Sequence, residues 1–471
     1  MHDTALTPVT EEEEVALPHL APRNSSLTDQ LIHLLSQVVL VSNESHDVLA
    51  ASRRRGRPAT LALSHLALAL LVGVLHGSRH LTTIWRRLSV EPIGPFSAVC
   101  LTYEAVRKRL LTHGVEALQH LFEQVSCGLA SCSATLHPSA CRLAPFASQL
   151  LALDETTLDR LRRLTRDVRD VPAGDPHLLP GKLACLFDLR TQRFVRVQFR
   201  ADVLAACNTA LLLLLEGLAP GCLILADLGY FSFAWFDYLT GQGYFWVSRL
   251  KEQVSYDLVE VFAYDDATGL LDALIWLGSS RANRAAHPVR LVCFTLAGTR
   301  SRYVTNVLSP SHLSMQQIAQ LYARRWDIEM AFNLLKSDLG LHLWWGARPE
   351  LVMVQLWVAL ILAQLLYAVQ SSLALQAQVE PSEVSMHVLV ELLDLCPVGP
   401  TPVLETLLEK GRHLGLLRPS SRLHVTVPSK ASHTLSPPPA APPRPRHARY
   451  PRPKTTRSAP FLSRFLSRLL I

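Results

Sequence analysis

The stretch "YARRWDIEMAFNLLKSDLGL" carries four side chains that could bind or react, and they recur at helical spacing. On a helical wheel of about 100° per residue, Tyr322, Arg325, Glu329 and Lys336 fall within a sector of roughly 60°. An apolar stripe suited to face a core lies on the opposite side: Ile328, Ala331, Leu334 and Leu335. One interpretation is a solvated helix face with an ordinary Arg–Glu pair of small energy. The other places Glu329 in a site whose remaining carboxylates lie elsewhere in the chain.

Two aspartates upstream follow apolar runs of strand length. Asp154 follows "QLLAL" and Asp227 follows "CLILA", a buried run that leads into the turn "DLGY". In open α/β sheets, side chains at the carboxyl ends of strands project into the crevice where ligands bind. Each aspartate alone is better explained as a turn or helix-capping residue, because an unpaired charge is costly to bury.

The three carboxylates together indicate metal chemistry. Mg²⁺ prefers oxygen ligands and is usually held by a few carboxylates that converge from separate segments. Two such ions, about 3.5–4 Å apart, can activate an attacking oxygen and stabilise a leaving oxygen in phosphoryl transfer. Asp154, Asp227 and Glu329 are therefore the expected metal ligands and catalytic residues. The phenol and cations of Tyr322, Arg325 and Lys336 would then contact the phosphates of the substrate.

The spacing Tyr-x2-Arg-x3-Glu-x6-Lys resembles the signature of the insertion-sequence-four family of DDE transposases. "LALDETTL" and "ILADLGYF" resemble the first and second catalytic motifs of that family, and the resemblance spans roughly Ser148 to Leu366. It implies an RNase H-like fold and a transposase that cleaves transposon-end DNA and joins it to target DNA. It also implies two Mg²⁺ ions, for which Mn²⁺ could substitute, a hairpin intermediate and a homodimer on paired ends.

The same resemblance implies that the end is held near the hairpin by Tyr322, Arg325 and Lys336, and that a flipped base is stacked. Trp276 is a candidate for that stacking, although a core tryptophan is the simpler interpretation. Two positions depart from the family pattern: Glu155 follows Asp154 where small residues are common, and Leu228 follows Asp227 where a basic residue is common. The alternative function is therefore a catalytically inactive, transposase-derived DNA-binding protein.

The residue patterns predict an α/β protein with a mixed sheet flanked by helices. Two strands around a turn at Arg190–Gln192 are expected after the strand that ends near Asp154, and strand–helix–strand follows through Asp227. The predicted organisation is a poorly ordered segment (1–50), a helical DNA-binding domain (51–145), a first part of the catalytic core (146–250), a β-rich insertion (251–310), a second part of the core with the Glu helix (311–375), a helical region (376–428) and a Pro/Arg-rich tail (429–471).

The N-terminal helical region carries the cations expected to recognise transposon ends. "TYEAVRKRLLTHG" presents Arg107, Lys108 and Arg109, and a helix of this kind could enter the major groove of DNA. An ordinary solvated helix surface explains the same three residues equally well. Transposon-end DNA and target DNA are the expected partners.

The totals set further bounds. The formal net charge is +7, but the segment Ala431–Ile471 carries eight Arg or Lys and no acidic residue, so the rest of the chain is close to neutral. Nine cysteines without a CxxC favour a reducing compartment, and no secretory signal pattern is present, so we expect a cytoplasmic, nucleoid-associated protein. Three apolar stretches, Leu61–Gly77, Ala210–Leu228 and Val352–Leu375, contain polar residues and are expected to be buried core elements rather than membrane spans.

Overall fold

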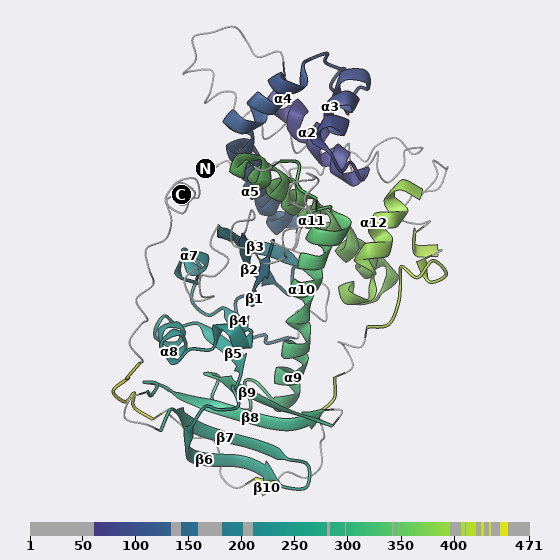
Figure 1. Cartoon of the computed structure of the whole chain (residues 1–471). Helices are drawn as coiled ribbons and strands as arrows, with labels where there is room; N and C mark the ends of the chain where they lie inside the picture. Colours follow the sequence, from purple (N-terminus) through teal and green to yellow (C-terminus); the bar gives the residue numbers. More distant parts are fainter. Residues whose placement is uncertain are drawn as a thin grey trace, which may run out of the picture.

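The computed structural model (Figure 1) describes residues 61–132, 143–158, 181–200, 211–279, 283–296, 298–341, 343–346, 348–395, 407–409, 411–420, 425–427, 433–434 and 443–450. The predicted N-terminal segment 1–50 and most of the predicted tail 429–471 lie outside these residues.

A single sheet of ten strands forms the centre of the described fold, in the order β10-β6-β7-β8-β9-β5-β4-β1-β2-β3. The strands are β1 (Leu150–Thr157), β2 (Lys182–Asp188), β3 (Arg193–Arg200), β4 (Leu223–Ala226), β5 (Phe245–Arg249), β6 (Tyr256–Asp265), β7 (Leu270–Leu277), β8 (Pro288–Leu296), β9 (Thr299–Thr305) and β10 (His433–Thr434). The prediction of a mixed α/β sheet is confirmed, since β1, β4 and β5 run parallel and the other neighbouring pairs are antiparallel.

The predicted hairpin is present between β2 and β3. These strands pair in antiparallel register from Lys182–Arg200 to Asp188–Arg193. Gln192 in the turn has a φ of 52°, a left-handed conformation that L side chains other than Asn and Asp seldom adopt. The side-chain nitrogen of Gln192, Nε2, donates to the Leu189 carbonyl at 3.0 Å and so stabilises the turn.

The interval 251–310 is rich in β-structure, as expected, but its strands do not form a sheet of their own. β9 returns to pair with β5 along Val247–Thr305, so β6 to β9 extend the sheet beyond β5. The apolar runs predicted four strands here, but only the long-range β5–β9 pairing could show that they continue the central sheet. Figure 1 shows these strands as a broad layer beneath β4 and β5.

The helices lie on both faces of the sheet. They are α2 (Leu63–Leu75), α3 (Leu81–Val90), α4 (Tyr103–Arg109), the π-helix η1 (Leu110–Gly114), α5 (Val115–Cys132), α7 (Leu211–Leu215), the 3₁₀ helix η4 (Leu228–Tyr230), α8 (Phe233–Gly241), α9 (Met315–Arg324), α10 (Trp326–Asn333), the π-helix η5 (Leu334–Asp338), α11 (Pro349–Ala377), the 3₁₀ helix η6 (Pro381–Glu383) and α12 (Met386–Leu395). One core joins the N-terminal helices, α9 to α12 and one face of the sheet, and a second core joins α7 and α8 to the other face.

The predicted N-terminal helical region is indeed helical between residues 63 and 132, but its core is continuous with that of the rest of the chain. α11 provides the link: Trp357 contacts Phe122 of α5, with ring centroids 5.3 Å apart. On the same helix, Gln364 donates to the Ser126 hydroxyl at 2.9 Å and to the Phe194 carbonyl of β3 at 3.0 Å. The helical region is thus fastened directly to the sheet.

The expectation that the apolar stretches are buried core elements is confirmed for most of the described residues, but Leu212 and Leu213 of α7 are exposed. In α2 and β4 nearly every side chain is buried. Within the described residues, α11 is long and apolar enough to cross a membrane by composition, but 83% of its most apolar window is buried inside the protein. Its glutamines make internal hydrogen bonds, among them the 2.8 Å bond from Gln355 to the Leu343 carbonyl.

Part of the predicted tail is packed rather than solvated. β10 pairs with β6, and residues 443–450 form a two-way backbone bridge between Arg449 and Arg284, with N–O distances of 2.8 and 2.9 Å. Composition alone predicted a solvated segment because proline and arginine dominate it. The contacts that hold it come from residues more than 150 positions earlier in the chain.

Candidate active site

The two predicted aspartates lie side by side at the same edge of the sheet. β1 and β4 are parallel, and Leu153 stands opposite Ala226 in their register. Asp154 and Asp227 are the next residue of each strand, so both come to the carboxyl end of a parallel pair, where α/β sheets place ligand sites. Asp227 continues the extended backbone of β4 with φ −73° and ψ 166°.

Both aspartates project toward the face of the sheet that α9 and α10 cover. Side chains alternate along a strand. Leu150 and Ala152 of β1, and Leu223 and Leu225 of β4, belong to the core on that face. Alternation therefore turns Asp154 and Asp227 to the same side as the helix that carries Glu329.

The helix expected to carry the signature is interrupted inside it. α9 begins with a capping box in which Ser314 and Gln317 bond each other's backbone nitrogen, and it ends at Arg324. α10 begins at Trp326, so Arg325 lies at the junction of the two helices. The predicted apolar stripe of Ile328, Ala331, Leu334 and Leu335 is buried, with exposed fractions of 0 or 1%.

Arg325 lies between two of the three carboxylates. Its guanidinium is 2.6 Å from Glu329 Oε1 and 3.0 Å from Asp154 Oδ2. The i, i+4 pair of the simpler interpretation therefore exists, but the same guanidinium also reaches a strand 171 residues earlier in the chain. Arg325 is only 7% exposed, and its buried Nε has no hydrogen-bond partner. A buried pair of this kind stabilises the fold only while all its members are present.

The pKa of Asp154 is raised to about 6. Burial is the largest cause, because it penalises the charged form, and the neighbouring charges of Asp227 and Glu329 raise the pKa further. Arg325 and the backbone N–H of Glu155, which donates to Asp154 Oδ1 at 2.8 Å, lower it in part. Asp227 and Glu329 therefore lie close enough to Asp154 for their charges to raise its pKa.

Tyr322 closes the site on the Asp227 side. Its hydroxyl is 3.5 Å from Asp227 Oδ1, and its ring lies between the Tyr303 ring at 4.8 Å and the Arg325 guanidinium at 5.6 Å. Burial raises the pKa of Tyr322, so the phenol stays protonated and acts as a hydrogen-bond donor.

Lys336 lies in η5, where the helix widens into a π turn. Its ammonium contacts the hydroxyl of Thr156, two residues after Asp154 on the same face of β1. The straight helical wheel placed Lys336 on the polar edge without predicting this widening. The π turn rotates the residues that follow it relative to a regular helix, and such turns are frequent at functional sites.

A buried network that sequence reasoning missed holds this helix junction against the sheet. Asp327 accepts from Arg324 at 2.7 Å and from Gln192 of the β2–β3 turn at 3.3 Å. Arg324 is 4% and Asp327 3% exposed, so the pair lies in the core. The "RRWD" string contains this pair at i, i+3, but nothing in the string distinguishes Arg324, which pairs with Asp327, from Arg325, which pairs with Asp154.

Two further residues at this edge were not singled out from the sequence. Ala226 stands opposite Ser248 in the parallel β4–β5 register, so Arg249 lies level with Asp227 and is exposed. The charge of Arg249 acts on Tyr322, which places it near the site. Trp326 is 51% exposed although it directly follows Arg325. The signals available were a cation at the end of a parallel strand and an aromatic residue beside the signature.

Glu155, one of the departures from the family pattern, points away from the site. Alternation turns it to the face opposite Asp154, where it lies 2.7 Å from Lys182 of β2 and 3.6 Å from Arg200 of β3. Its side chain is 10% exposed, so these cations compensate a buried charge. Glu155 is therefore not a fourth carboxylate of the site.

The remaining predicted DNA-binding residues lie in other elements. Arg107, Lys108 and Arg109 form the last turn of α4, which packs against α3 and η1, and Arg107 pairs with Glu104 at 2.8 Å. Lys108 is exposed. Trp276 belongs to β7, separated from β4 by three strands, and its ring is covered by the guanidinium of Arg446 at 4.8 Å. The structure does not bring Trp276 to the carboxylates.

The donor set suits a hard divalent cation, because the groups that converge here are carboxylates. In the arrangement described, Arg325 contacts the oxygen atoms of Asp154 and Glu329 that a metal ion would need. Among the residues that the structure describes, no group of three or more His, Cys, Asp or Glu is arranged to hold a metal ion.

Known proteins match this part of the chain. Residues 148–366 match the family model described as the transposase DDE domain, a range that contains Asp154, Asp227 and Glu329. A curated protein of Sinorhizobium fredii, named as a candidate transposase, y4zB, is 26% identical over 151 residues. That alignment covers 31% of this chain and 42% of the relative, so the chain spans less than half the length of the relative it matches.

A solved structure is also similar to the chain as a whole. It is the piggyBac transposase synaptic complex with hairpin DNA, with a TM-score of 0.38 and 11% sequence identity. The similarity covers 85% of this chain and 87% of that one. A likeness of this size says nothing about the residues of the site.

Proposed function

We propose that this chain is a DDE transposase that cleaves transposon-end DNA and joins it to target DNA by metal-dependent phosphoryl transfer. The observation that carries the proposal is the convergence of Asp154, Glu329 and Asp227 around Arg325 and Tyr322, inside the region that matches the transposase DDE domain. Ordinary surface carboxylates would not be gathered from two strands and a helix beside one buried arginine and one buried tyrosine.

The strand order supports an RNase H-like catalytic core. Within the large sheet, β3-β2-β1-β4-β5 forms a five-stranded unit in which four strands run in one direction and β2 runs in the opposite direction. This is the arrangement expected of an RNase H-like sheet. It places the first two carboxylates on adjacent parallel strands and leaves the third to a helix that packs over them.

In the proposed mechanism, Asp154, Asp227 and Glu329 hold two Mg²⁺ ions, or Mn²⁺ in their place, which when bound activate the attacking oxygen and stabilise the leaving one. Arg325 must release Asp154 and Glu329 before these oxygens can serve as ligands. A DNA phosphate is an anion that can take over the guanidinium, because arginine binds phosphate oxygens through its planar fork of donors.

The chain's own donors would hold the scissile strand. The hydroxyl of Tyr322 is a hydrogen-bond donor beside Asp227, and the ammonium of Lys336 lies beside β1. Arg249 adds an exposed cation at the end of β5. These donors fix the position of the phosphate without reading sequence. Trp326 is exposed next to Arg325 and offers a ring on which an unpaired base can stack.

The remaining parts of the proposal rest on the family resemblance. They are a hairpin intermediate, a homodimer on paired ends, recognition of the ends by Arg107, Lys108 and Arg109, and a place in the cytoplasm with the nucleoid. The exposed Lys108 at the end of α4 supports an external role for that turn. The pairing of Trp276 with Asp257 of β6 and the guanidinium of Arg446 over its ring support a structural role for Trp276 instead of base stacking.

Cleavage of labelled DNA carrying the inverted repeats that flank the gene tests the proposal. The full chain with Mg²⁺ should nick the ends, and Asp154→Ala, Asp227→Ala and Glu329→Gln should abolish nicking while DNA binding persists. Glu155→Gln is the matched control, since Glu155 is an adjacent carboxylate that faces the other side of the sheet. A wild type that binds the ends but never nicks them, with either Mg²⁺ or Mn²⁺, would favour the inactive DNA-binding alternative.

A further inference from the structure

The docked part of the C-terminal segment, residues 443–450, makes contacts that the proposed function does not use. This segment, here called the strap, lies against the turn between β7 and β8 and against α8. Arg446 N donates to the Ala286 carbonyl at 2.8 Å, and the Arg449–Arg284 bridge extends the pairing by one more step. Two short backbone contacts alone would hold such a segment weakly.

The side chain of Arg446 provides the main attachment. It donates to three carbonyls at the two ends of the β7–β8 turn, those of Leu277 at 2.6 Å, Gly278 at 2.7 Å and Ala285 at 2.9 Å. It also lies 3.5 Å from Asp257 and covers the ring of Trp276. A guanidinium has five donors, so one side chain can bond several carbonyls at once.

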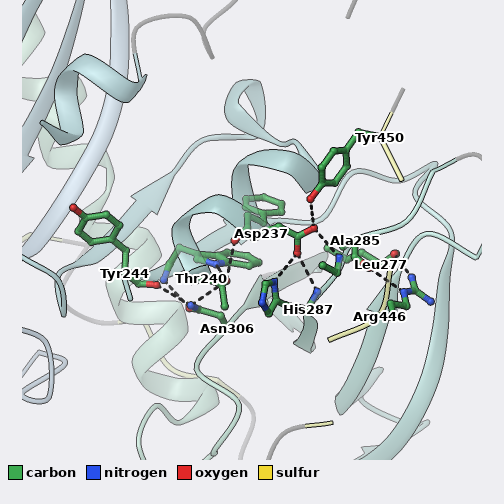
Figure 2. Close-up of polar contacts among 12 residues, drawn as sticks. Asp237, Thr240, Tyr244, Leu277, Ala285, His287, Asn306, Arg446 and Tyr450 are labelled. Atoms are coloured by element: carbon green, nitrogen blue, oxygen red, sulfur yellow. Dashed lines mark hydrogen bonds and ion pairs between the residues drawn. The ribbon is translucent and has the colours of Figure 1, made fainter. Parts of the chain in front are cut away.

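Asp237 of α8 is the second attachment point. It is 8% exposed and accepts four hydrogen bonds, from Ala286 N at 2.7 Å, His287 N at 3.0 Å, His287 Nδ1 at 3.0 Å and the Tyr450 hydroxyl at 2.6 Å. A buried carboxylate without such donors would be costly. Figure 2 shows Asp237 between Tyr450 of the strap and His287, the residue before β8, with Arg446 beside Ala285 and Leu277.

The turn that the strap contacts packs against the first residue of α8, a helix that follows Asp227 closely in the chain. Gly278 has a φ of +75°, and a Cβ at this position would lie 2.2 Å from Asn283 O and 2.8 Å from the ring of Phe233. Phe233 is the first residue of α8, and Phe231 just before it packs edge-on against Phe236 of the same helix, with ring centroids 5.0 Å apart. The turn thus contacts α8 at Phe233, and the short helical turn before α8 begins at Asp227, whose carbonyl accepts from Tyr230 N at 3.0 Å.

We propose that Arg446 and Tyr450 are positioning residues, through which the strap holds the β7–β8 turn and α8 in place and so fixes the backbone that carries Asp227. The backbone around Asp227 would then need the strap to hold its position, although the strap contacts none of the three carboxylates. The effect on the metal site rests on the proposed function. The effect on the backbone does not.

Hydrogen exchange of the full chain tests the backbone effect. Arg446→Ala should speed amide exchange in residues 277–287 and 227–241 by about tenfold or more, since it removes three hydrogen bonds and a ring contact. Tyr450→Phe, which removes a single hydroxyl and leaves the packing intact, should speed exchange at Ala286 and His287 by a smaller factor. Arg444→Ala is the matched control, because Arg444 is exposed on the same strap and its substitution removes the same charge.

A second readout separates positioning of Asp227 from local fastening. Arg446→Ala should weaken Mn²⁺ binding, measured by electron paramagnetic resonance, by several fold, whereas Arg444→Ala and a chain ending at Pro451 should match the wild type. The chain ending at Pro451 keeps the strap and removes the five later basic residues.

The outcomes are distinct. If amide exchange in Arg446→Ala and Tyr450→Phe stays within twofold of the wild type, the strap does not hold the β7–β8 turn and α8 in place. Faster exchange with unchanged Mn²⁺ affinity would overturn the positioning of Asp227. A wild type that binds no Mn²⁺ counts against the proposed metal site. The exchange rates of residues 227–241 then test by themselves whether the strap holds this backbone.

Discussion

The guanidinium of Arg325 lies 3.0 Å from the carboxylate of Asp154, although the two residues are 171 positions apart. The same guanidinium is 2.6 Å from Glu329. One buried cation thus holds the oxygens of a strand and of a helix that the proposed reaction needs for metal ions. Under the proposed function, binding of DNA and of metal ions would be coupled, because a phosphate that attracts Arg325 would also free the carboxylates.

Arg325→Ala should bind Mn²⁺ more tightly than the wild type in the absence of DNA, by roughly tenfold, because the competing cation is gone and the carboxylates repel one another. It should also cleave end DNA poorly, since a phosphate contact is lost. Isothermal titration with Mn²⁺ measures the first effect. Arg300→Ala, an exposed arginine of β9, is the charge control, and equal affinities of Arg325→Ala and the wild type would show that Arg325 does not compete with the metal ion.

Asp154→Asn should remove a pH dependence of the unfolding free energy. The folded pKa of Asp154, about 6, is above the usual 3.8, so the folded state holds this proton more tightly than the unfolded state. The stability gained from this proton is fully present below pH 3.8 and is lost as the pH rises through about 6. The loss is about 1–3 kcal/mol.

Urea unfolding without metal ions, between pH 4 and 7, measures this term. Asp154→Asn should lie above the wild type at pH 7 and show a flatter profile, whereas the exposed Glu216→Gln should follow the wild type. Parallel profiles for Asp154→Asn and the wild type would contradict the raised pKa.

Arg324→Ala should destabilise the fold by about 3–5 kcal/mol, because it leaves Asp327 buried without its cation. The double variant Arg324→Met with Asp327→Leu should recover much of that loss, since it removes both charges and keeps the volume. Urea unfolding of Arg324→Met, of Asp327→Leu and of the double variant gives the coupling energy. A coupling energy near zero would mean that this pair does not hold α10 against the β2–β3 turn.

Arg249→Ala should weaken binding of end DNA and lower the slope of log affinity against log salt by about 1, the contribution of one phosphate contact. Fluorescence anisotropy at several salt concentrations measures the slope. Arg300→Ala, on the neighbouring β9, is again the control. An unchanged slope for Arg249→Ala would place the DNA backbone away from the end of β5.

Much of the local structure followed from the sequence. The apolar runs ending at Asp154 and Asp227 are strands β1 and β4, the turn at Arg190–Gln192 joins β2 to β3, and the stripe of Ile328 and Leu335 is the buried side of the Glu329 helix. These features are readable because alternation and the helical repeat state which side of an element faces the core.

The partners of the charged residues could not be read in the same way. Arg324 and Arg325 are adjacent and chemically identical, yet one pairs with Asp327 in the core and the other with Asp154 at the site. Glu155 and Asp154 are also adjacent, yet alternation along β1 turns them to opposite faces. The difference arises from which elements pack on each face, and no local pattern contains that information.

The sequence by itself therefore determined which residues could form the site and which strands and helices carry them. The tertiary structure decided that β6 to β9 continue the central sheet, that Arg325 lies between Asp154 and Glu329, and that residues 443–450 dock on α8. The physical reason is the range of the interactions. Periodicity and turn preference act over a few residues, whereas strand pairing at an edge and the compensation of buried charge depend on groups brought together only by folding.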